Sequence, residues 1–366
     1  MPNEPEILVE RRGTAGVITL NRPAALNAVT RGMVGTLREA LTRWRDDGAV
    51  TRIIITAAGG RAFSAGGDLR QIYEAGRAGR QEESIAFWRE EYALNTLIKR
   101  YPKPCVALID GIVMGGGVGI SVHGSHRLAG DRFQFAMPEV GIGFFPDVGA
   151  TWFLPRLPGA IGTYLALTGE RLKAADAVAV GIATHRVASA RFSELVEALC
   201  GAAPVDAILA AFAEPAEPSP SPQSKSAVAD FDCSIDAHRT AIDRIFAAGS
   251  VEEILALLDA EAATASCDAR WAGEVAATIR AKAPLSLKIA LEQMRRGSKW
   301  SFEECMRAEF RVVSRVAYGH DFYEGIRAVI IDKDNRPQWR PATLAEVTAE
   351  TVERHFAPLE SELVLP

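Results

Sequence analysis

Two glycine-rich stretches of this 366-residue chain have the residue types and spacing for a site in which backbone N–H groups bind a reacting oxygen. Residues 63–69 read FSAGGDL and residues 114–120 read MGGGVGI, and each follows an apolar run that predicts a strand. Unpaired N–H groups at the start of a helix gather partial positive charge, and glycine lets another group approach the backbone closely. Two such turns from neighbouring strands could aim two amides at one oxygen, as an oxyanion hole requires.

Other uses of glycine-rich turns fit these residues less well. GxGxxG is not satisfied because Ile120 stands where the third glycine belongs, and the P-loop pattern GxxxxGK[ST] does not occur. The nucleophile elbow GxSxG fails because His123 takes the place of its last glycine. Glycines that serve only close packing stay an alternative explanation.

Two carboxylates lie downstream, in the apolar segment MPEVGIGFFPDVGA. Glu139 and Asp147 are eight positions apart, between hydrophobic residues and two prolines. An acid among apolar side chains has its pKa raised by desolvation, which makes both residues candidates for catalysis. Asp147 could instead cap a helix over residues 148–154. Glu139 could instead be an exposed acid in a turn.

Metal sites have weaker support. His123 and His126 lie three apart on an expected helix, but no third ligand accompanies them. Residues 332–335 (DKDN) begin like a calcium loop but lack its glycine and its closing glutamate. Glu90 and Glu91 are expected on a solvated helix face. We therefore predict no metal.

The elements that must position these residues alternate between strand and helix signals. Thr30 is a possible N-cap for a helix that ends before Gly48, and Gly13 separates two runs that read as a hairpin. The short apolar runs are too uniform for half-exposed strands, which favours a layered α/β core. The expected strands cover 7–9, 16–20, 51–56, 104–109 and 132–137, and the expected helices cover 30–45 and 82–100.

The character of the chain changes after Gly169, where Ala- and Leu-rich helical patterns take over. Residues 214–226 read EPAEPSPSPQSKS, a composition typical of a loop or linker. We therefore predict a catalytic core over 1–213, a Pro/Ser-rich linker over 214–228, and a mostly helical region over 229–366.

Composition restricts the compartment and the partners. The 41 basic and 46 acidic residues give a net charge of -5, so no basic field is present to hold nucleic acid or an anionic membrane. Five cysteines without a CxxC pair favour a reducing compartment. The first residues lack the pattern of a signal peptide, and no apolar run is long enough to cross a bilayer. We predict a cytoplasmic protein.

Several motifs together resemble the crotonase (enoyl-CoA hydratase/isomerase) superfamily, and within it the 3-hydroxyisobutyryl-CoA hydrolase branch. The resemblance covers nearly the whole chain and implies a spiral of β-β-α units with a helical C-terminal region. It leaves a homo-oligomer open, since related proteins use C-terminal helices for assembly. The motifs are AFSAGGD, MGGGVG and MPEVGIGFFPDVGAT at the site, and NRPAALNA, REEY, SVHGSHRLA, YLALTGERL and FYEGIRAVIIDKDNRPQW elsewhere.

The resemblance implies a role for each matching residue. The amides of Gly67 and Gly116 would form an oxyanion hole for a thioester carbonyl, and Glu139 and Asp147 would be the catalytic acids. The second acid of REEY, Glu91, matches a position that contacts substrate. The neighbouring residues expected to bind substrate are Gly66, Asp68 and Gly115.

One departure from the family pattern separates two reactions. A hydratase carries a second glutamate three residues after the middle glycine of its GGG turn, and here that position is Gly119. Water addition to an alkene is expected to use two acids together, so hydratase activity is disfavoured. The resemblance therefore implies hydrolysis of a short branched 3-hydroxyacyl-CoA in valine breakdown, without a further cofactor because CoA is part of the substrate. The alternatives are an enoyl-CoA hydratase or isomerase, and a non-catalytic acyl-CoA-binding or RNA-binding protein.

Overall fold

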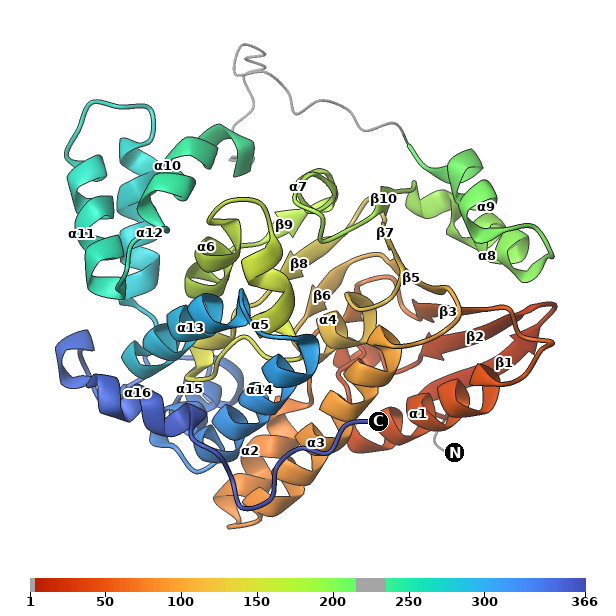
Figure 1. Cartoon of the computed structure of the whole chain (residues 1–366), viewed down its shortest axis with the longest axis horizontal. Helices are drawn as coiled ribbons and strands as arrows, with labels where there is room; N and C mark the ends of the chain where they lie inside the picture. Colours follow the sequence, from red (N-terminus) through yellow and green to blue (C-terminus); the bar gives the residue numbers. More distant parts are fainter. Residues whose placement is uncertain (1–3, 215–234) are drawn as a thin grey trace.

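A computed structural model describes residues 4–214 and 235–366 of the chain (Figure 1). Apart from Glu214, the predicted linker over 214–228 lies outside the described residues. The strands of the described part form two sheets.

The larger sheet has the strand order β1-β2-β3-β5-β7-β10. Its first two strands form the antiparallel hairpin expected around Gly13, and the following pairs are parallel. The strands are β1 (Ile7–Arg12), β2 (Ala15–Leu20), β3 (Arg52–Ala57), β5 (Cys105–Ile109), β7 (His126–Ala129) and β10 (His185–Arg186).

The smaller sheet has the order β4-β6-β8-β9 and consists of short strands. β4, β6 and β8 pair in parallel, and β9 is antiparallel to β8. The strands are β4 (Ala62–Ser64), β6 (Ile112–Met114), β8 (Gln134–Ala136) and β9 (Leu172–Lys173).

From β3 to β8, consecutive strands alternate between the two sheets. β3 and β4 precede α2 (Leu69–Arg77) and α3 (Gln81–Lys99), and β5 and β6 precede α4 (Gly116–Ser121). This repeat confirms the predicted spiral of β-β-α units. The consequence for the site is that β4 and β6, which end just before the two glycine turns, are neighbours in one sheet.

The strands β2, β3 and β5 of the larger sheet are buried on both faces, as the run at residues 51–56 predicts, whereas β1 at the edge is partly exposed. Ile54 points to a cluster with α8 (Phe192–Cys200) and α9 (Val205–Phe212). Its neighbours Ile53 and Ile55 point to the main core, which includes residues of α1 (Arg31–Arg45). The expected N-cap is confirmed, because the Thr30 side chain accepts a hydrogen bond from the Met33 N–H.

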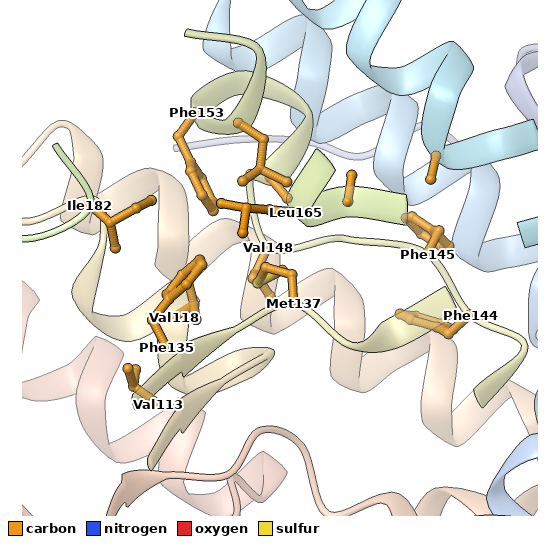
Figure 2. Packing of buried hydrophobic residues seen from close by; sticks show 14 of the residues in the cluster. Val113, Val118, Phe135, Met137, Phe144, Phe145, Val148, Phe153, Leu165 and Ile182 are labelled. Atoms are coloured by element: carbon orange, nitrogen blue, oxygen red, sulfur yellow. The ribbon is translucent and has the colours of Figure 1, made fainter. Parts of the chain in front are cut away.

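The main core continues behind the smaller sheet. Figure 2 shows this packing, in which side chains from β6, α4 and β8 meet those of the segment that follows β8. The labelled residues in this segment include both an aromatic pair and Val148, all buried. Members of the cluster are Val113, Val118, Phe135, Met137, Phe144, Phe145, Val148, Phe153, Leu165 and Ile182.

The second half of the chain is helical, as predicted, and several of its helices pack against the first half. α14 contacts α3 and α5, and α13 contacts α5 and α6. None of the helices in the two described ranges combines the length and hydropathy of a membrane span. The α-helices whose bounds have not yet been given are α5 (Ala150–Phe153), α6 (Ile161–Thr168), α7 (Ala174–Ala179), α10 (Arg239–Ile245), α11 (Val251–Ala262), α12 (Ala269–Arg280), α13 (Pro284–Gly297), α14 (Phe302–Val316), α15 (His320–Ile326) and α16 (Ala349–Phe356).

Candidate active site

The two glycine turns meet at one place. The sequence suggested that each turn follows a strand of the larger sheet, but short strands β4 and β6 stand in between. Because these strands are parallel neighbours, their carboxyl ends bring the turns together. A Cβ built on Gly116 would lie 3.5 Å from the amide nitrogen of Gly67.

The N–H groups of Gly67 and Gly116 are left without acceptors. Gly67 forms an isolated parallel bridge with Val29, in which Val29 donates to the Gly66 carbonyl and accepts from the Asp68 N–H. This pattern uses the groups on either side of Gly67 and leaves its own N–H unbonded. Gly116 lies in the first turn of α4, where no preceding carbonyl is available. Neither N–H has an acceptor among the residues that the structure describes.

Glycine is required at the second turn for two reasons. Gly115 has φ of 45°, in the left-handed region that disfavours other residues. At Gly116, an added Cβ would lie 2.5 Å from Oε1 of Glu91, which is too close for two unbonded atoms. The backbone here is therefore approached closely by side chains, as the sequence predicts.

A cavity of about 380 Å³ opens beside these turns. Its lining includes both glycine pairs and three of the predicted acids. These residues are Gly66, Gly67, Gly115, Gly116, Glu91, Glu139 and Asp147. Aromatic side chains complete the wall, and the rings of Trp88 and Phe144 stack with their centroids 5.6 Å apart. The predicted catalytic residues and most predicted substrate-binding residues are thus brought together.

Asp68 lies apart from this lining. Its side chain accepts a hydrogen bond from the Gln71 N–H and so caps α2, and it forms an ion pair of 3.1 Å with Arg22. Both interactions give Asp68 a structural role at the start of α2. A direct contact of this side chain with a substrate in the cavity stays a prediction.

Glu139 faces the glycine turns from a buried position. It begins a 3-10 turn over Glu139–Ile142 and is 6% exposed, so the alternative of a solvated turn acid is wrong. Its Oε1 lies 3.3 Å from the position of a Cβ on Gly115, and its Oε2 has no hydrogen-bond partner among the described residues. Burial, and secondly the charge of Asp147, raises the pKa of Glu139 well above its usual value.

Asp147 is buried on the same cavity and accepts a hydrogen bond from the Tyr92 hydroxyl at 2.8 Å. Burial raises the pKa of Asp147 to about 7, and the Tyr92 hydrogen bond opposes this rise. The alternative of a helix cap is wrong, because Gly149 is the N-cap of α5 and no side chain caps it. Tyr92 was not singled out from the sequence.

Glu91 is also buried, so the expectation that it lies on a solvated helix face is wrong. Its Oε1 has no partner among the described residues, and burial raises its pKa well above the usual range, with the charge of Asp147 adding to the effect. The neighbouring Glu90 does face outward, where it pairs with Arg31 at 2.6 Å. Two adjacent residues of α3 therefore place one acid in the cavity and the other toward the surface.

The cavity lining also contains two cations that were not predicted, an exposed arginine and a half-buried lysine. Arg171 and Lys282 belong to its lining, and neither side chain has an anionic or hydrogen-bonding partner among the described residues. Lys282 is partly buried near Gly141, and burial lowers its pKa. Cations in a lining without partners are suited to bind an anionic group of a ligand.

The space beside Gly119 is filled from two sides. A Cβ at this position would lie 2.7 Å from Nδ2 of Asn95 and 2.8 Å from Cβ of Val148. Asn95 is buried, and its amide atoms have no partner among the described residues. A glutamate at position 119 therefore has no room unless these neighbours move.

The weaker candidates have structural partners. His123 bonds to the Val148 carbonyl at 2.7 Å, and His126 to Asp206 at 2.9 Å. Both acids of the 332–335 run pair with Arg327. Over residues 4–214 and 235–366, no group of three or more His, Cys, Asp or Glu side chains is placed to hold a metal.

Comparison with known proteins identifies similar chains. A family model described as "Enoyl-CoA hydratase/isomerase" matches residues 15–356. The chain is 46% identical to the "3-hydroxyisobutyryl-CoA hydrolase, mitochondrial" of Danio rerio, over 97% of this chain and 90% of that one. It is 44% identical to the human protein of the same name, over 97% of this chain and 89% of that one.

Two solved structures have the same fold over nearly all of the chain. One is described as a carnitinyl-CoA dehydratase from Mycobacterium thermoresistibile, with 44% identity, a TM-score of 0.88 and coverage of 99% of both chains. The other is described as an enoyl-CoA hydratase from Rhodobacter sphaeroides, with 38% identity, a TM-score of 0.85, and coverage of 99% of this chain and 100% of that one.

Proposed function

This chain belongs to the enoyl-CoA hydratase/isomerase family, and we propose that it hydrolyses 3-hydroxyisobutyryl-CoA to 3-hydroxyisobutyrate and CoA. One observation carries the proposal. The unbonded N–H groups of Gly67 and Gly116 and the buried carboxyl of Glu139 meet at one cavity. The similarity to curated proteins named 3-hydroxyisobutyryl-CoA hydrolase supports the choice of acyl group. The proposed reaction would belong to valine breakdown.

The two amides would bind the thioester oxygen. As a nucleophile adds to the carbonyl carbon, negative charge builds on this oxygen, and donors fixed in advance stabilise it without reorganisation. The first turn of α4 adds the partial positive charge of a helix start. In this mechanism, the geometry of Gly67 and Gly116 sets most of the rate.

Glu139 would supply the attack in one of two ways. Its carboxylate adds to the carbonyl carbon, the C–S bond breaks, and water then hydrolyses the acyl anhydride. Alternatively, it takes a proton from water, and the resulting hydroxide adds to the same carbon. In both routes the CoA thiolate leaves and needs a proton. A carboxyl with its pKa raised toward neutrality, as at Asp147, is suited to donate that proton or to bind the substrate hydroxyl.

The CoA portion would extend toward Arg171 and Lys282. CoA carries phosphate groups, and these two cations line the cavity without anionic partners among the described residues. The net charge of -5 gives no general attraction for phosphate, so local cations are needed. We assign both residues to phosphate binding.

Hydration of an enoyl-CoA is the second candidate, because the two solved structures described above are called a dehydratase and a hydratase. The filled space beside Gly119 argues against it. Asn95 and Val148 occupy the volume that a second glutamate would need at this position. A hydratase would therefore have to recruit Glu91 or Asp147 as its second acid.

Other expectations stay predictions. These are the cytoplasmic location, the absence of a further cofactor, and assembly through the C-terminal helices. The names of the curated relatives place those proteins in mitochondria.

Thiol release from a panel of acyl-CoA substrates tests the proposal. With 3-hydroxyisobutyryl-CoA we expect free thiol, and with crotonyl-CoA we expect neither thiol nor loss of the enoyl absorbance. Glu139→Gln should lower kcat on the order of 10²-fold or more. Glu90→Gln is the matched control, because Glu90 lies outside the cavity lining and forms an ion pair with Arg31. Near-normal turnover by Glu139→Gln, or crotonyl-CoA hydration without thiol release, would contradict the proposal.

A further inference from the structure

A fourth buried acid lies behind the cavity, on a helix of the C-terminal region. Glu309 of α14 is fully buried. Its Oε2 accepts a hydrogen bond from the Gly149 N–H at 2.7 Å, and its Oε1 accepts one from the Thr151 N–H at 2.9 Å. Glu309 does not line the cavity, so it has no contact with a substrate there.

The two bonds hold the segment that carries Asp147. Gly149 lies two residues after Asp147, and Val148 between them has φ of 50°. This conformation is unusual for a β-branched residue and persists only where the surroundings fix it. The carboxylate of Glu309 bonds the backbone on the far side of this strained residue.

A second side chain of the C-terminal region holds the same segment. Nε2 of Gln293, on α13, donates to the Pro146 carbonyl at 2.9 Å and to the Thr151 hydroxyl oxygen at 2.7 Å. Residues 146–151 are therefore fixed at both ends by α13 and α14. This arrangement determines where the Asp147 carboxyl can point.

Electrostatics connects Glu309 to Asp147 as well. Burial, and secondly the charge of Asp147, raises the pKa of Glu309 to about 8, although the bonds from Gly149 and Thr151 favour its charged form. The other titratable groups around the two acids are buried too. They are Glu91, Tyr92 and Glu139 on the Asp147 side, and His123 and Cys305 near Gly149 and on α14. Neither acid forms an ion pair with a cation among the described residues.

We propose that Glu309 is a positioning residue for the reaction: it holds the backbone of Gly149 and Thr151 so that Asp147 stays against Tyr92 in the cavity. The inference rests on the proposed hydrolysis and adds a residue from the C-terminal helices to it.

Two substitutions alter the two hydrogen bonds in different ways. Glu309→Gln replaces one acceptor oxygen by an amide donor, so one backbone N–H loses its partner. Glu309→Asp keeps the carboxyl group but is one methylene shorter, so it cannot reach both N–H groups. Glu303→Gln on the same helix is the control, because Glu303 is in an ion pair with Arg100 at the surface.

The measurement is the pH profile of kcat and kcat/KM for thiol release, together with Tm. We expect Glu309→Gln to lower kcat on the order of 10²-fold with KM nearly unchanged. The limb of the profile that Asp147 sets should move to higher pH, because an Asp147 carboxyl that leaves Tyr92 loses the hydrogen bond that opposes the rise of its pKa. Glu309→Asp should lower kcat and move that limb in the same direction, because it too releases the backbone that holds Asp147. A residue that only stabilises the fold would lower Tm and leave the limb in place.

An active Glu309→Gln variant with an unshifted profile and normal kcat overturns the inference and leaves the proposed hydrolysis intact. If Glu309→Gln does not fold, Glu309→Asp decides: a lowered kcat at unchanged KM supports the positioning role, and a normal kcat overturns it. A wild-type chain that releases no thiol overturns both proposals.

Discussion

The cavity lining has a buried part with acidic side chains, called the inner end, and a more exposed part with basic side chains, called the rim. At the inner end, Glu91, Glu139 and Asp147 are buried together, and the cations in the described lining lie elsewhere. At the rim, Arg171 and Lys282 have no anionic partner among the described residues. Burial disfavours the charged form of each carboxyl in this cluster, so Asp147 is suited to hold the proton that Glu139 must lack in order to react. We therefore expect the inner end to govern kcat and the rim to govern KM.

Gly116→Ala should have the largest effect and tests whether the inner end governs kcat. The added Cβ would lie 2.5 Å from Oε1 of Glu91 and 3.5 Å from the Gly67 nitrogen, so the amide pair would shift. Loss of one such donor costs about 10² to 10³ in kcat, and we expect a loss of this size in steady-state thiol release. Gly35→Ala on α1 is the control, because its Cβ would meet no atom within 4 Å. Equal rates for the two variants would remove the amides from the mechanism.

Asp147→Asn tests the inner end through stability. The pKa of Asp147 is raised to about 7 in the folded chain from an ordinary value of 3.8. Between these values the unfolded chain loses a proton that the folded chain keeps, so the free energy of unfolding falls as pH rises. We expect the difference between wild type and Asp147→Asn to change by about 1 kcal/mol per pH unit in this window.

Urea unfolding from pH 4 to 8 measures that difference. The surface substitution Asp46→Asn serves as the control, since this side chain is largely exposed. A difference that stays constant across the window would mean that Asp147 titrates as an ordinary surface acid.

Lys282→Ala should have the smallest effect and should act on binding. We expect KM for the acyl-CoA to rise about tenfold, with kcat nearly unchanged, because one charge-assisted contact is lost. The corresponding acyl-pantetheine thioester lacks the CoA phosphates, so its KM should not change. Lys299→Ala, an exposed lysine outside the cavity lining, is the control. A change in kcat with both substrates would place Lys282 at the inner end instead.

Much of the fold could be predicted from the sequence, because the signals for its strands, helix caps and turns are local. The run at residues 51–56 (TRIIIT) is β-branched apart from Arg52 and contains three consecutive isoleucines, which is sufficient to predict a buried strand. The Thr30 cap depends on a side chain and a backbone three residues apart, so the pattern contains both partners. The two glycine turns were found for the same reason, because their conformational needs are local.

The environment of the acids was harder to predict, because it depends on contacts distant in sequence. Glu91 was assigned to a solvated face, although it lies on the same side of α3 as the buried Phe87, Trp88 and Asn95. Glu309 offers the same signal on α14, where it continues the apolar positions Cys305 and Phe302. An acid that interrupts the apolar stripe of a helix could have identified both residues. The short strands β4 and β6 carry too few residues for periodicity to detect.

The dependence of the cavity on α13 and α14 has a consequence for biosynthesis. The groups proposed to react lie within residues 67–147, whereas Gln293 and Glu309, which fix the Asp147 segment, are translated much later. A nascent chain that has left the ribosome only to residue 214 would carry the reacting groups in an unfinished arrangement. We therefore expect thioester cleavage to begin only after α13 and α14 have been synthesised and have packed against this segment.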